Sequence, residues 1–228
     1  MEETKYTTII FDLDGTLFYT SDDIAISANL TLDKLGFKQL DKDNIISHVG
    51  GGIHNSISRI LGDAAHDNPE YSWDATFVDN VVKTYRKIYA EHYLDTTKPY
   101  PGVEVTLEKL HENNLNLAVV SNKTIEFTRL IVEHFHMDKY FDVILGGDSL
   151  DNKKPHHEPL EHVINHYNSD KNETIIVGDT EKDIAAATNA GIASCGVTYG
   201  MRNPEDIKAM KPDFVIDKFD EIRDVLTL

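Results

Sequence analysis

Residues 6–17 read YTTIIFDLDGTL, a β-branched and aromatic run that stops at a cluster of aspartate, glycine and threonine. Residues of the first kind favour strands and those of the second favour turns, so the run predicts a strand over residues 6–11. Asp12 and Asp14 then stand at its carboxyl end. Ligands of open parallel sheets bind at the carboxyl ends of strands, which makes these two carboxylates the first candidates for a functional site.

A block without strands separates this strand from the rest of the sheet-forming sequence. Apolar residues recur at helical spacing in residues 22–35, 53–61 and 73–93. The block is about 75 residues long, far more than an ordinary connection, and it predicts an inserted helical subdomain over residues 18–95. Residues 64–71, which are polar and contain a proline, are expected to be a loop between two of its helices.

Beyond residue 101, strand-like and helix-like segments alternate. Strands are predicted at residues 115–120, 141–145, 174–177, 193–197 and 214–216, and helices at 103–113, 124–135, 158–167, 181–190 and the carboxyl terminus. Such alternation predicts a parallel sheet with helices on both faces. The expected fold class is therefore α/β, with a Rossmann-like core of residues 1–17 and 96–228 and an all-helical cap subdomain at 18–95.

Composition and charge favour a soluble globular protein with small-molecule partners. The 228 residues carry a net charge of −17, which would repel nucleic acid and anionic membranes. No apolar run approaches the ~18 residues of a membrane span, and the first residues lack signal-peptide features. The single cysteine, Cys195, excludes an intrachain disulfide, so we expect a cytoplasmic protein. Monomer and dimer both remain open.

Polar residues also follow two of the later predicted strands. They are Ser121, Asn122 and Lys123 after one strand, and Asp179 and Asp183 after another. Because the carboxyl ends of parallel strands meet at one edge, the aspartates should converge there with Asp12 and Asp14. Clustered carboxylates cannot all stay ionised without a counter-ion, and all-oxygen ligation suits Mg²⁺. The neighbouring Lys153 and Lys154 would give such a site positive charge for an anionic phosphoryl group.

Four motifs in this order resemble those of the haloacid dehalogenase-like hydrolase superfamily, in its phosphatase branch. They are DLDGTL at 12–17, VVSNK at 119–123, KPHHEP at 154–159 and GDTEKD at 178–183, and the resemblance spans nearly the whole chain. The position of the helical insert, the glycine run in it and VTYG at 197–200 are most similar to the phosphoglycolate phosphatase group. The resemblance implies a Mg²⁺-dependent phosphomonoesterase that acts on a small phosphorylated metabolite, with phosphoglycolate as the type of substrate.

The resemblance also implies roles for the four aspartates. Asp12 would be the nucleophile that forms an aspartyl-phosphate. Asp14 would protonate the leaving oxygen, then activate water, and its backbone carbonyl would bind the metal. Asp179, supported by Asp183, would complete a metal site formed by all four residues.

The phosphoryl group would be held by the second and third motifs. The resemblance implies that Ser121 and Lys154 contact phosphoryl oxygens as part of the catalytic machinery. It also implies that Asn122 and Lys123 bind substrate beside them. An ordinary helix N-cap is the structural alternative for Ser121, and a solvated surface lysine is the alternative for Lys154.

Substrate choice is expected to depend on the cap. Gly51 and Gly52 would form a loop that faces the substrate, and Arg59 would pair with a substrate carboxylate, although an exposed arginine without a specific role is equally compatible with the sequence. Two positions depart from the phosphatase group: Tyr19 stands where an acidic residue is usual, and His157 where proline is usual. Tyr19 puts the identity of the substrate in doubt rather than the reaction.

Other functions stay open on the sequence. A pyrophosphatase or a sugar phosphomutase of the same superfamily would use the same residues. A haloacid dehalogenase fits less well, because halide displacement needs neither a leaving-group acid at Asp14 nor a metal. A catalytically inactive binding module is the alternative of another class. The histidines, among them His162 and His166 at helical spacing, follow no predicted strand and are expected to be structural or solvated.

Overall fold

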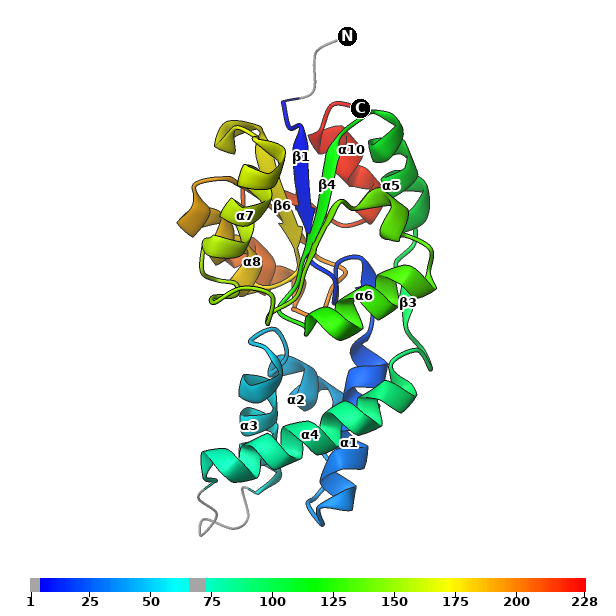
Figure 1. Cartoon of the computed structure of the whole chain (residues 1–228), viewed down its shortest axis with the longest axis vertical. Helices are drawn as coiled ribbons and strands as arrows, with labels where there is room; N and C mark the ends of the chain where they lie inside the picture. Colours follow the sequence, from blue (N-terminus) through cyan, green and yellow to red (C-terminus); the bar gives the residue numbers. More distant parts are fainter. Residues whose placement is uncertain (1–4, 66–72) are drawn as a thin grey trace. The chain divides into compact units, whose positions relative to one another are not determined.

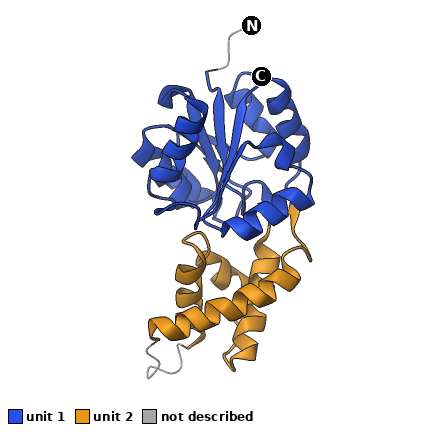
Figure 2. Ribbon diagram, in the orientation of Figure 1, with its two compact units in different colours: residues 1–19, 99–228 blue, residues 20–98 orange. Residues whose placement is uncertain are grey.

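The computed structural model describes residues 5–65 and 73–228. The chain divides into two compact units, unit 1 of Met1–Tyr19 with Pro99–Leu228, and unit 2 of Thr20–Lys98 (Figure 2). The loop expected at residues 64–71 lies outside the described residues from residue 66 onward. Within the described residues, each helix is too short or too polar to cross a membrane.

Unit 1 is built around a six-stranded sheet with the order β5-β4-β1-β6-β7-β8, in which neighbouring strands run parallel (Figure 1). The strands are β1 (Thr8–Phe11), β4 (Asn116–Val120), β5 (Val143–Leu145), β6 (Thr174–Gly178), β7 (Ala193–Val197) and β8 (Phe214–Ile216). Every residue of β1 is buried, as expected for a strand covered on both faces. The α/β fold class predicted from the alternating pattern is confirmed.

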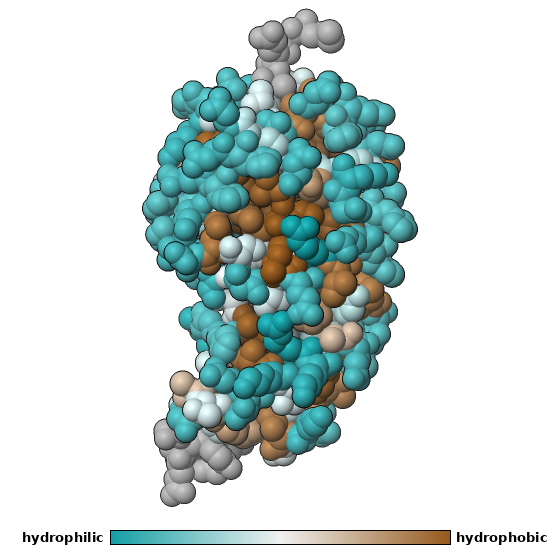
Figure 3. All heavy atoms as spheres, viewed as in Figure 1, coloured by the Kyte–Doolittle hydropathy of each residue, from teal (hydrophilic) through white to brown (hydrophobic). Residues whose placement is uncertain are grey.

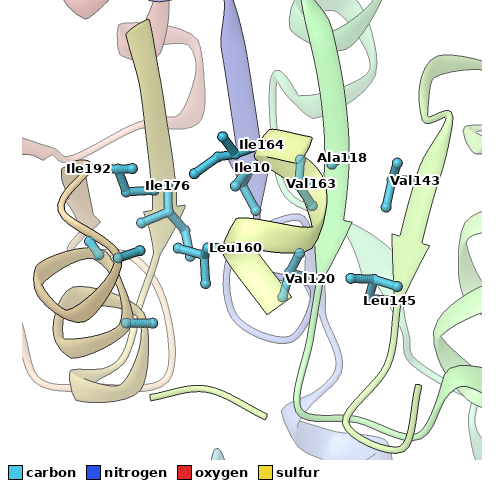
Figure 4. Packing of buried hydrophobic residues seen from close by; sticks show 13 residues of the cluster. Ile10, Ala118, Val120, Val143, Leu145, Leu160, Val163, Ile164, Ile176 and Ile192 are labelled. Atoms are coloured by element: carbon cyan, nitrogen blue, oxygen red, sulfur yellow. The ribbon is translucent and has the colours of Figure 1, made fainter. Parts of the chain in front are cut away.

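Helices cover both faces of this sheet. They are α5 (Val103–Glu112), α6 (Ile125–His134), α7 (Glu158–Tyr167), α8 (Glu181–Ala190), α9 (Pro204–Ala209) and α10 (Ile222–Val225). On one face, Leu160 and Val163 of α7 join Ile10 in a buried cluster (Figure 4). On the other, the ring of Phe11 packs 5.6 Å from that of Phe219. Consecutive residues of β1 therefore point into two separate cores.

Unit 2 is all-helical apart from the first residue of a short strand. Its helices are α1 (Ser21–Lys34), α2 (Lys42–Ser47), α3 (Ile53–Ala64) and α4 (Ala75–His92), and α1 packs against the other three. The sequence pattern does not predict α2, because this helix is six residues long and buries only Ile45 and Ile46, too little for a periodic pattern. Helix α9 and the pairing of β2 (Phe18–Tyr19) with β3 (Lys98–Pro99) are also too short for the pattern to predict.

On the face that Figure 3 displays, hydrophilic residues cover the outer parts of unit 1, whereas hydrophobic residues gather in its middle. Among the described residues, the large apolar side chains with more than a third of their surface exposed are Ile26, Leu30, Leu35, Val105, Leu130 and Val215. Partly exposed apolar side chains of this kind are normal in globular proteins.

A fully buried carboxylate joins the beginning and the end of unit 2. Asp23, in the first turn of α1, accepts hydrogen bonds of 2.6–3.1 Å from the backbone N–H and the hydroxyl groups of Thr96 and Thr97. A buried charge is tolerated only when its oxygens are satisfied, and here both oxygens have several donors. Asp23 thus holds the two segments that connect unit 2 to the rest of the chain.

Asp23→Ala is expected to lower the free energy of unfolding of unit 2 by about 3 kcal/mol or more, because several buried donors lose their acceptor at once. Urea unfolding followed by the fluorescence of Trp73, the single tryptophan, measures this unit directly. Thr84→Val is the control, since it removes one exposed hydroxyl bond, to the carbonyl of Asn80. A midpoint shift no larger than that of the control would contradict the prediction.

Candidate active site

Three buried carboxylates meet at the carboxyl edge of the sheet. Oxygen atoms of Asp12, Asp179 and Asp183 lie within 4.8 Å of one another. The register explains the meeting, because Phe11 of β1 pairs with Val177 of β6 and the N–H of Asp12 donates to the Val177 carbonyl at 2.9 Å. The residues that follow the two strands therefore emerge side by side.

One ammonium group lies among these carboxylates. Lys154 is 3% exposed, and its Nζ donates to Asp12 Oδ1 at 2.8 Å, to Asp183 Oδ1 at 2.6 Å and to the Val120 carbonyl at 2.5 Å. Burial by itself lowers the pKa of Lys154, but the two carboxylates outweigh it, so the net pKa is raised. Lys154 is therefore a buried cation and not a solvated surface lysine.

A single lysine does not balance the negative charge of this cluster. Burial raises the pKa of Asp12 to about 7, with repulsion from Asp183 adding to the rise and Lys154 opposing it. Burial, followed by repulsion from Asp12 and Asp183, raises the pKa of Asp179 well above its usual value. Further positive charge would restore both carboxylates to their ionised forms. The oxygen donors and the charge deficit fit a divalent metal ion.

The carboxylate of Asp179 lies in a cradle of glycines. Gly15 adopts a φ of +85°, and a Cβ on either Gly15 or Gly200 would collide with the Asp179 side chain. The N–H of Met201 donates to Asp179 Oδ2 at 2.6 Å. The absence of side chains at both glycines lets the backbone approach this carboxylate closely.

Asp183 is held by other contacts. Its Oδ1 accepts from Lys154, and its Oδ2 accepts from the N–H and the hydroxyl of Thr180, at 3.1 and 2.7 Å. Thr180 and Asp183 form a capping box at the start of α8. Both oxygens of Asp183 are thus held in place, one by Lys154 and the other by Thr180.

Asp14 and Lys123 form a second ion pair beside the cluster. Lys123 Nζ lies 3.0 and 3.2 Å from the two carboxylate oxygens of Asp14, and both side chains are largely buried. Asp14 follows β1, while Lys123 follows β4, the strand on the other side from β6. The edge of the sheet thereby brings together residues that follow three different strands.

Ser121 and Asn122 complete this edge. The N–H of Ser121 donates to the Leu145 carbonyl at 3.0 Å, its Oγ accepts from the N–H of Lys123 at 3.2 Å, and Asn122 Nδ2 donates to the Lys154 carbonyl at 2.8 Å. The alternative role of Ser121 as a helix N-cap is wrong, because α6 begins at Ile125 and its N-cap residue is Thr124.

The candidate residues of the cap belong to unit 2. Gly51 and Gly52 precede α3, and Arg59 is an exposed residue of that helix. The carboxylates, lysines and loop described above all belong to unit 1. Within the described residues, no histidine belongs to a cluster of metal-ligating side chains.

Some contacts of the site were not anticipated from the sequence. The Thr180–Asp183 capping box has a readable signature, a threonine followed three residues later by a carboxylate. By contrast, a single sequence carries no signal that Gly200 and Met201 would support Asp179, because residues 179 and 200 are brought together only by the ends of β6 and β7.

Comparisons with known proteins identify the family to which this chain is similar. A family model described as haloacid dehalogenase-like hydrolase matches residues 9–197. A phosphoglycolate phosphatase of Vibrio parahaemolyticus is 34% identical over 96% of both chains, and the pyrophosphatase PpaX of Halalkalibacterium halodurans is 32% identical over 96% of both. The crystal structure of a predicted phosphoglycolate phosphatase from Haemophilus somnus superposes with a TM-score of 0.91 at 31% identity, covering 97% of this chain and 98% of that one.

Proposed function

This chain belongs to the haloacid dehalogenase-like hydrolase family and is a phosphatase, and from that premise we propose that it hydrolyses phosphate monoesters of small metabolites through an aspartyl-phosphate on Asp12. The observation that carries the proposal is the buried contact of Asp12 with Lys154 at 2.8 Å beside Asp179. A carboxylate with one cation at its side is suited to attack a dianionic phosphoryl group.

In the first step, an Oδ atom of Asp12 attacks phosphorus while the bond to the ester oxygen breaks. Asp14 donates its proton to that oxygen, which leaves as an alcohol. Asp14 lies two residues beyond the nucleophile on the same turn, and Gly15, with its positive φ, shapes this turn. The products of the step are the free alcohol and an acyl phosphate on Asp12.

In the second step, water attacks the phosphorus of the acyl phosphate. Asp14, now ionised, takes a proton from the water, and the bond between phosphorus and Asp12 breaks to release inorganic phosphate. Lys123 Nζ, 3.0 Å from Oδ1 of Asp14, holds this carboxyl group in position for both steps. The proton that Asp14 gave away in the first step is thereby recovered, and Asp12 is regenerated.

Two sets of groups would neutralise the negative charge of the phosphoryl group. We assign Lys154, Ser121 and the backbone N–H of Asn122 to the phosphoryl oxygens, and we call residues 121–123 the phosphoryl loop. Asp12, Asp179 and the Asp14 carbonyl would hold Mg²⁺, with Asp183 fixing Lys154 beside them. Bound there, Mg²⁺ would supply Lewis-acid neutralisation of the negative charge on the phosphoryl group.

The substrate that we propose is a small cytoplasmic phosphate monoester of the phosphoglycolate type. Several relatives, including that of Vibrio parahaemolyticus, carry the name phosphoglycolate phosphatase. The relative named pyrophosphatase makes inorganic pyrophosphate the second candidate. Phosphate release should be measured with Mg²⁺ for phosphoglycolate, pyrophosphate, sugar phosphates and p-nitrophenyl phosphate. Release from none of them would contradict the proposed activity and favour an inactive binding module.

Arg59 is the proposed contact for a substrate carboxylate. Arg59→Ala is expected to lower kcat/KM for phosphoglycolate by about 10- to 100-fold, the loss of a charge-assisted hydrogen bond of ~1.5–3 kcal/mol. Hydrolysis of p-nitrophenyl phosphate, which has no carboxylate, should change little. Arg86, a cationic residue of α4, provides the matched control as Arg86→Ala.

An equal loss on both substrates would mean that Arg59 serves folding or general phosphate binding. No loss on either would exclude Arg59 and direct attention to Gly51 and Gly52. Each of these outcomes would contradict the assignment of Arg59 to the carboxylate.

A further inference from the structure

The first turn of α6, the helix that follows the phosphoryl loop, is capped by a residue that is distant in the sequence. Thr124, the N-cap residue of α6, belongs to a type that commonly caps helices, yet its buried hydroxyl makes no hydrogen bond within the described residues. Instead, Oδ1 of Asp148 accepts a bond of 2.7 Å from the N–H of Ile125, the first residue of α6. Asp148 lies in the turn that follows β5, and we call residues 146–148 the support turn.

The support turn also contacts the loop through its backbone. The N–H of Gly147 donates to the Lys123 carbonyl at 2.7 Å. A Cβ on Gly146 would collide with the backbone of Ile125, and a Cβ on Gly147 with the backbone of Asn122. The two glycines therefore permit a close contact of backbone against backbone that other residues would prevent.

On its other side, the phosphoryl loop is held by the catalytic machinery itself. Asn122 Nδ2 donates to the Lys154 carbonyl at 2.8 Å. The loop is thus fixed between Lys154, which contacts Asp12, and the support turn, which contains none of the proposed catalytic residues. Substitutions in the support turn can test the position of the loop without altering a group that touches the substrate.

We propose that Asp148 is a positioning residue of the phosphatase reaction, which fixes the first turn of α6 and thereby the phosphoryl loop relative to Asp12. This inference rests on the proposed function of the loop. Displacing a positioning group by about 1 Å can cost roughly 100-fold in rate. Because every substrate shares the phosphoryl group, the loss should be equal for all substrates, unlike the selective loss expected for Arg59.

The test compares Asp148→Ala, Asp148→Asn and a matched control, Asp74→Ala. Asp74 also accepts a 2.7 Å bond, from the N–H of Phe77, and is also exposed, but it caps α4 in unit 2. Asp148→Ala should lower kcat/KM for phosphoglycolate and p-nitrophenyl phosphate by the same factor, about tenfold or more, while Asp74→Ala stays within about twofold of the wild type. Asp148→Asn keeps an acceptor oxygen and should stay within about threefold.

Three kinetic results would overturn the inference: a wild-type kcat/KM in Asp148→Ala, an equal loss in Asp74→Ala, or an Asp148→Asn enzyme as impaired as Asp148→Ala. Thermal unfolding of both alanine variants shows whether they lose similar stability. If the wild type hydrolyses none of the substrates, the proposed function fails, and amide hydrogen exchange then tests the inference alone. Faster exchange over residues 121–126 in Asp148→Ala, but not in Asp74→Ala, supports it, and unchanged exchange overturns it.

Discussion

Asp12→Asn is expected to lower kcat by about 10⁴-fold or more on every substrate, because the amide has nearly the same shape as the carboxylate but is a poor nucleophile. The variant should remain folded. The raised pKa of Asp12 shows that burial already disfavours its charge, so an uncharged side chain at this position removes a cost of folding. Lys154 keeps Asp183 as a partner in the variant.

The measurement is phosphate release by the purified variant together with its thermal unfolding curve. Asp12→Asn should melt no lower than the wild type, which separates loss of chemistry from loss of structure. Asp142→Asn, an exposed carboxylate at the other end of β5, is the matched control and should keep wild-type kcat. Normal turnover by folded Asp12→Asn would remove Asp12 from the role of nucleophile.

Metal removal should also abolish most of the activity. In excess chelator, phosphate release is expected to fall below about 1% of its original rate, because the clustered carboxylates then repel the phosphoryl group. Mg²⁺ should restore activity, and Ca²⁺ should do so poorly, since its larger and looser coordination shell would misplace the phosphoryl group. Full activity in the chelator would exclude the metal assignment.

A second readout does not depend on turnover. Binding to the folded state stabilises a protein, so Mg²⁺ should raise the melting temperature of the chelator-treated wild type. The shift should disappear in Asp179→Asn, which loses a proposed ligand. It should persist in Asp217→Asn, whose carboxylate accepts a hydrogen bond from Thr198 and is not part of the cluster of Asp12, Asp179 and Asp183. An equal shift in both variants would place the metal elsewhere.

The sequence alone determined the fold class and the order of the chemical motifs. Strand and helix patterns in residues 103–197 depend on local periodicity, and Asp12 or Asp179 follows a strand wherever that strand lies in the sheet. Local patterns need a minimum length, however. The six residues of α2, the six of α9 and the two of β2 are held by tertiary packing and carry no periodic signal.

Only the tertiary structure decided which side chains are partners. Lys154 was assigned to phosphoryl oxygens from its motif, but its contacts with Asp12, 142 residues away, and with Asp183 follow from the strand order, which places β1 between β4 and β6. Asp148 carried no motif, and its capping bond exists because β5 lies next to β4, so that the chain segments after both strands meet. Local sequence determines the secondary structure of each segment. Contacts between distant residues depend instead on which strands pair, and no short stretch of the sequence specifies that pairing.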